Sequence, residues 1–108
     1  MSNNAVNYLK KLIDNRWLSM DFNKNYILEC QKAIIGFISE IRIIESIVGD
    51  EISLANASEI SILKDEYETL RVSIGIKEDC IRVCQESINA DSLEIARLKN
   101  LIRKLKGH

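Results

Sequence analysis

The sequence predicts an all-α protein: an antiparallel helical hairpin that becomes a coiled coil or a four-helix bundle when it self-associates. Apolar residues recur every seven positions in both halves of the chain, proline is absent from the 108 residues, and one short stretch separates the two repeats. An apolar repeat of about 3.5 residues forms the a/d seam of a helix that packs against another helix. A short connection between two such helices favours an antiparallel hairpin, which we expect to be one domain over residues 1–108.

The first helix is expected from about residue 5 to residue 48. Gly49 stands where a glycine commonly ends a helix, so the turn is placed at residues 49–57. Weak helix formers near residues 18–22 leave open a short separate N-terminal helix. The a positions are Val6, Ile13, Met20, Ile27, Ile34, Ile41 and Val48, and the d positions are Leu9, Arg16, Asn23, Cys30, Phe37 and Ile44.

The second helix is expected from about residue 58 to residue 106. Asn56 and Glu59 resemble a capping box at its start. Residues 89–92 could form a joint, but a continuous second helix is favoured. In the antiparallel register that places Ile13 opposite Leu98, Arg16 lies one layer from Asp91, which predicts an interhelical ion pair. The a positions are Ile60, Tyr67, Ile74, Ile81, Ile88, Ile95 and Ile102, and the d positions are Leu63, Leu70, Lys77, Cys84, Asp91, Leu98 and Leu105.

Apolar residues outside the seam predict self-association. A helix that is apolar nearly all round is buried on several sides, and one partner helix cannot cover every such residue. We therefore expect a homo-oligomer, with a two-fold dimer favoured. A helix from another protein is the alternative occupant. The expected self-association residues are Leu28, Ile35, Ile38, Ile43 and Ile47.

Charge is unevenly distributed although the net charge is only −1. Residues 1–16 and 93–108 contain eight Lys/Arg and two acidic residues, whereas residues 40–68 contain eight Asp/Glu and two basic residues. Complementarity with the helix dipole is the simpler explanation, and a surface that binds an acidic protein is the functional one. The expected partner-binding residues are Tyr8, Lys10, Lys11, Trp17, Lys99, Arg103, Lys104 and Lys106.

Neither catalysis nor metal binding is predicted. Cys30, Cys80 and Cys84 are the only set that could converge, but a structural zinc site takes four ligands and the single histidine is His108. The acidic residues lie mainly on outer helix faces, whereas acid–base catalysis needs carboxylates that converge in a cleft. We therefore expect no enzyme activity and no cofactor.

These patterns favour a non-enzymatic protein–protein interaction module, such as an adaptor, small chaperone, assembly factor or inhibitor. The alternative is a nucleic-acid-binding module that uses the basic end, against which stand a pI of about 5.8 and the lack of interleaved aromatic residues. No apolar stretch is long enough for a membrane span. The start of the chain does not resemble a signal peptide, so a cytoplasmic location is expected.

Overall fold

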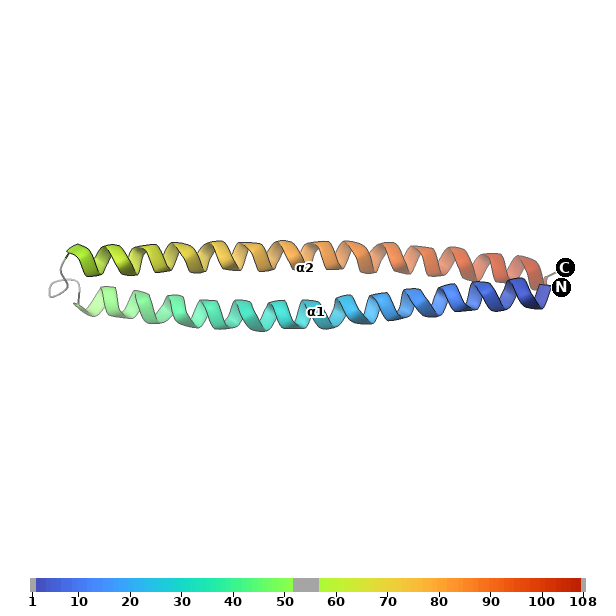
Figure 1. Ribbon diagram of the computed structural model, residues 1–108, viewed down its shortest axis with the longest axis horizontal. Coiled ribbons are helices and arrows are strands. Elements are labelled where there is room, and N and C mark those ends of the chain that lie inside the picture. The colour runs from blue at the N-terminus through green and yellow to red at the C-terminus, as the bar shows by residue number, and fades with distance from the viewer. Residues whose placement is uncertain (1, 52–56, 108) are drawn as a thin grey trace. The chain divides into compact units, whose positions relative to one another are not determined.

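The computed structural model describes residues 2–51 and 57–107, and it contains two helices of 50 residues each (Figure 1). Helix α1 spans Ser2–Glu51 and helix α2 spans Ala57–Lys106. The predicted all-α helical hairpin is confirmed. Two compact units each combine a segment of α1 with a segment of α2. Unit 1 contains residues up to Ile27 and from Arg82 onward, and unit 2 contains Leu28–Ile81.

Helix α1 is longer than predicted, and both helices are continuous within their bounds. Helix α1 continues through Gly49 to Glu51, and no described glycine has a positive φ, so the prediction that Gly49 ends the first helix is wrong. A glycine ends a helix efficiently only when it takes the left-handed conformation. The breaks considered near residues 18–22 and 89–92, and with them a separate N-terminal helix, are also absent. The predicted capping box falls on Asn56, which lies outside the described residues.

Seam packing explains why the weak helix formers stay helical. Met20 and Asp91 lie within the two stretches of low propensity, yet both side chains are buried, at 7% and 3% exposure. Burial of the side of a helix that faces its neighbour contributes more to helix stability than intrinsic propensity does. All described a and d residues are buried or half-buried except Arg16 and Leu105, so the predicted seam is confirmed within each unit.

Unit 1 contains the better-packed core. Ile13, Met20, Ile95 and Leu98 form one buried cluster, and Leu98 is only 1% exposed. The predicted ion pair is present, with Arg16 Nη1 3.1 Å from Asp91 Oδ1. Asn23 lies further along α1 than Arg16, and its Nδ2 donates a hydrogen bond of 3.1 Å to Ser87 Oγ, one helical turn before Asp91 in α2. Residue numbers that rise along α1 thus meet numbers that fall along α2, as an antiparallel pair requires.

Unit 2 has a thinner core. Cys30, Ile44 and Leu70 are its buried apolar residues, and the rest of its seam is half-buried. Arg71 Nη1 donates a 3.1 Å hydrogen bond to Tyr67 Oη, and this bond raises the pKa of the Arg71 guanidinium. Within the described residues, neither helix has a segment long and apolar enough to cross a membrane.

Candidate protein-binding surfaces

Heptad position defines two sides in each unit, one on either flank of the seam. A pocket in unit 2 is lined by seam residues together with Glu45 and Gly49 of α1 and Lys64 and Glu68 of α2, all of which occupy e or b positions. The e and b positions of both helices therefore share one side, which we call the e/b side. The c and g positions share the opposite side, the c/g side. In unit 1, Lys99 Nζ lies 6.0 Å from the ring centroid of Trp17, and both residues occupy e positions.

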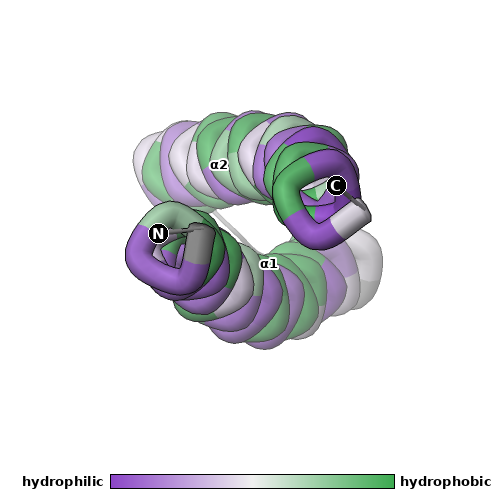
Figure 2. Tube along the Cα trace, turned by 90° about the vertical axis from the view of Figure 1, so that its right-hand side faces the viewer, coloured by the Kyte–Doolittle hydropathy of each residue, from purple (hydrophilic) through white to green (hydrophobic). Residues whose placement is uncertain are grey.

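Large apolar side chains are concentrated on the c/g side. Of the sixteen that are exposed in the described residues, eight are at c or g positions and four at e or b. Figure 2 shows the consequence, because hydrophobic segments appear on the outer surfaces of both helices rather than in a single stripe. The eight at c or g are Tyr8, Phe22, Tyr26 and Val83 in unit 1, and Ile43, Ile47, Ile62 and Ile76 in unit 2.

The five residues predicted to mediate self-association all lie in unit 2 and are all exposed, but they do not form one surface. Leu28, Ile35 and Ile38 lie on the e/b side, whereas Ile43 and Ile47 lie on the c/g side. Two isoleucines that the prediction omitted join the second group from α2, namely Ile62 at 65% exposure and Ile76 at 56%.

The predicted partner-binding residues are exposed in unit 1, and five of the eight share its e/b side. We call these five the basic side of unit 1: Lys10, Trp17, Lys99, Arg103 and Lys106. Lys11 lies at the outermost f position, and Tyr8 and Lys104 lie on the c/g side. Lys24 and Arg82 also occupy e/b positions of unit 1, and the prediction missed them.

The two units carry net charges of opposite sign, as the sequence ranges suggested. Unit 1 contains ten Lys/Arg and five Asp/Glu, for a net charge of +5, whereas unit 2 contains five Lys/Arg and eleven Asp/Glu, for −6. The c/g side of unit 2 is the extreme case, because its charged residues include Glu29, Glu40 and Glu66 but no described Lys or Arg. A field of one sign over each unit steers oppositely charged partners toward it.

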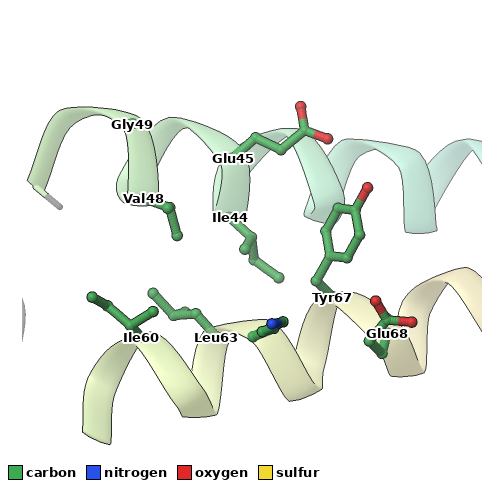
Figure 3. Close-up of a pocket in the computed structure, with 9 residues that line it drawn as sticks. Ile44, Glu45, Val48, Gly49, Ile60, Leu63, Tyr67 and Glu68 are labelled. Atoms are coloured by element: carbon green, nitrogen blue, oxygen red, sulfur yellow. The ribbon is translucent and has the colours of Figure 1, made fainter. Parts of the chain in front are cut away.

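An open apolar pocket of about 470 Å³ lies on the e/b side of unit 2 (Figure 3). Ile44 and Val48 of α1 and Ile60 and Leu63 of α2 point toward one another across it, and the Tyr67 ring closes one end. Ile44 is buried, but Val48, Ile60 and Leu63 are only half-buried, so their side chains leave the pocket open. Small-molecule sites enclose most of their ligand, so an open furrow of this kind suits a side chain of a protein partner better.

Unit 1 also has a local ion pair on its c/g side. Arg97 Nε donates a 2.9 Å hydrogen bond to Glu94 Oε2, and a second nitrogen of the guanidinium bonds the other carboxylate oxygen. These bonds lower the pKa of Glu94 and raise that of Arg97. Both groups are solvated, so the pair positions charge on the surface and adds little to stability.

Cys30, Cys80 and Cys84 are not joined by disulfide bonds. Cys30 and Cys84 are buried and Cys80 is half-buried. Across residues 2–51 and 57–107, no group of three or more His, Cys, Asp or Glu side chains is placed to hold a metal ion. A buried free cysteine behaves as a small hydrophobic residue in such a core.

Comparisons with known proteins add no further assignment. No protein-family model matches the sequence, and neither the curated proteins nor the solved structures contain a significant match. The surfaces described above are therefore the basis for the functional proposal.

Proposed function

We propose that this protein is a non-enzymatic protein–protein interaction module that works as a helical homo-oligomer, a dimer of hairpins in a coiled-coil or four-helix bundle, in the cytoplasm. One observation carries the proposal: unit 2 exposes Ile43, Ile62 and Ile76 at 56–65% although each helix already buries its seam against the other. Exposed apolar patches on a small protein commonly mark interaction sites. A second copy is the occupant that would cover them.

The basic side of unit 1 supports a second contact, with an acidic protein. Trp17 is 44% exposed with the Lys99 ammonium over its ring, so an apolar anchor and a positive charge are presented together. Tryptophan is enriched among the residues that dominate binding energy, and exposed charges raise the rate of association with oppositely charged partners. An adaptor, small chaperone, assembly factor or inhibitor could use such a surface.

Two measurements test the proposal. Light scattering on the purified protein at micromolar concentration should give twice the mass of the chain, and a monomeric mass would refute self-association. Affinity purification from the source cells should recover an acidic protein with the wild type but not with the triple variant Lys99→Glu, Arg103→Glu, Lys106→Glu. The matched control reverses three exposed cations of unit 2, Lys32, Arg42 and Lys64, and should retain the partner.

Binding of DNA or RNA to the basic side of unit 1 would contradict the proposal that its partner is an acidic protein. Contacts to phosphates release counterions, so affinity would fall steeply with salt concentration. In that case the complex with DNA or RNA would be salt-sensitive, lost in the Lys99, Arg103, Lys106 variant and kept in the unit 2 control. Nucleic acid, and not an acidic protein, would then be the partner of the basic side.

A further inference from the structure

We infer that the isoleucine face of unit 2 docks on the aromatic face of unit 1 in a second copy, so that two hairpins pair in opposite directions. The isoleucine face is Ile43, Ile47, Ile62 and Ile76, and the aromatic face is Tyr8, Phe22, Tyr26 and Val83; both are c/g sides. The inference rests on the proposed self-association and adds to it which surfaces meet and in which orientation.

The c/g side is assigned to the contact because the two sides of the seam differ in their apolar and charged residues. The c/g side contains half of the exposed large apolar residues. The e/b side of unit 1 instead contains six Lys/Arg and two Asp, and that of unit 2 contains three Lys/Arg and three Glu. The core of an interface between subunits is depleted in charge and enriched in aromatic residues. The c/g side of unit 1, with three charged residues and three exposed aromatic rings, fits that description, and its e/b side does not.

The charges of the c/g sides indicate which unit of the second copy the isoleucine face contacts. If unit 2 docked on unit 2, Glu29, Glu40 and Glu66 of each copy would face the same carboxylates of the other, with no described Lys or Arg on that side to offset them. Like charges brought together in an interface cost several kilocalories per mole. The c/g side of unit 1 has Lys104 and the Arg97–Glu94 pair, so docking on unit 1 replaces repulsion with attraction.

The shapes of the residues favour the same contact. Phe22 is 72% exposed and Tyr8 is 62% exposed, so unit 1 presents large rings. On the c/g side of unit 2, Gly36 lies one heptad before Ile43, and a Cβ built on this glycine meets nothing within 4 Å. A glycine at this position leaves space for a ring from the other copy. A two-fold dimer makes this contact twice, since each copy supplies both faces.

A pair of matched double variants tests which side is used. Ile43→Glu with Ile62→Glu should raise the dimer dissociation constant about a hundredfold, because two carboxylates would be desolvated against apolar rings. Leu28→Glu with Ile35→Glu makes the same chemical change on the e/b side, at 53% and 65% exposure, and should change the constant less than about tenfold. An equal or larger effect of the second pair overturns the inference. Circular dichroism should show unchanged helicity in both variants, since all four side chains are exposed.

Mixing charge variants tests the orientation. Ile62→Lys and Phe22→Glu should each dissociate the dimer alone, and an equimolar mixture should restore dimers because lysine of one chain then meets glutamate of the other. Failure of this mixture, or restoration by Ile62→Lys mixed with Ile43→Glu, would overturn the proposed orientation while leaving self-association intact. A monomeric wild type would instead refute the proposed function itself.

Discussion

Arg16 and Asp91 form an ion pair in which the aspartate is buried and the arginine is half-exposed. Arg16 Nη1 lies 3.1 Å from Asp91 Oδ1, yet the arginine side chain is 49% exposed and the aspartate side chain only 5%. The second carboxylate oxygen, Oδ2, is buried and has no hydrogen-bond partner among the described residues. A buried carboxylate that makes a single ionic contact depends on that contact, whereas a half-exposed arginine is solvated without it. The stability of unit 1 should therefore respond differently to the loss of each partner.

Removing Arg16 should destabilise the protein, and removing both partners should not. Arg16→Met leaves a buried carboxylate without a counter-charge and should lower the free energy of unfolding by about 1–3 kcal/mol. Arg16→Met combined with Asp91→Leu should restore wild-type stability or exceed it, because an apolar pair then fills the seam. Urea unfolding at fixed protein concentration measures both values.

The control for this cycle is an ion pair on the surface. Arg82 and Glu86 are both more than 60% exposed, so Arg82→Met should change stability by less than about 0.5 kcal/mol. If Arg16→Met were as mild as Arg82→Met, the Asp91 carboxylate would have to be hydrated in solution.

Two leucines of α2 should differ strongly in their contribution to stability. Leu98 is 1% exposed in the core of unit 1, so Leu98→Ala should cost about 2–5 kcal/mol through lost burial and the cavity that remains. Leu93 is 74% exposed at an f position, and Leu93→Ala should change stability by less than about 0.5 kcal/mol. Thermal and urea unfolding at matched concentration provide the comparison. Similar costs would mean that Leu93 is buried in the oligomer.

Heptad spacing accounts for how much of this structure could be predicted. The position of Leu98 in the repeat predicted its burial, and the register that follows from Ile13 and Leu98 predicted the Arg16–Asp91 contact. Gly49 was misread because its identity does not determine its φ, and only the left-handed conformation ends a helix there.

The candidate surfaces were only partly predictable for a different reason. Exposure of Ile35 and Ile43 followed from their positions off the seam, and their b and c positions place them on opposite sides of it. Lys99 Nζ lies 6.0 Å from the Trp17 ring although the two residues are 82 positions apart. Predicting this contact requires the register between the helices as well as the heptad pattern of each helix. What covers these surfaces depends on a second chain, which the heptad pattern of one chain does not specify.

The pKa of Glu94 should report directly on Arg97. The two hydrogen bonds from Arg97 hold the pKa of this carboxyl below its ordinary value. Because the pKa is lower in the folded state, the stabilisation is present above the ordinary pKa of a glutamate and is lost as the pH falls through the lowered value. Arg97→Met should return the Glu94 pKa toward its ordinary value, as measured by an NMR titration of the carboxyl carbon.

Arg97→Lys is the informative companion to that experiment. Lysine keeps the positive charge but cannot make the paired contact of a guanidinium, so the Glu94 pKa should rise only part of the way. An unchanged pKa in Arg97→Met would show that Arg97 turns away from Glu94 in solution.

Gly75 offers a simple route to a more stable hairpin. It lies inside helix α2, has no positive φ, and a Cβ built on it meets nothing within 4 Å. Gly75→Ala should therefore raise the free energy of unfolding by about 0.5–1 kcal/mol through higher helix propensity. Gly36→Ala is the matched variant on the c/g side, and a smaller gain there would indicate that another chain approaches that backbone. Urea unfolding distinguishes the two.

The uneven core has a consequence for the order in which the hairpin forms. The best-buried contacts, such as those around Ile13 and Leu98, join segments 85 residues apart, whereas Ile44 and Tyr67 of unit 2 line one pocket from only 23 residues apart. The entropic cost of closing a loop grows with its length, so the nearer pairs are favoured to meet first. Folding should then begin in unit 2, which has the thinner core, and end in unit 1. A partly folded chain would therefore expose the isoleucines of unit 2 before the core of unit 1 has formed.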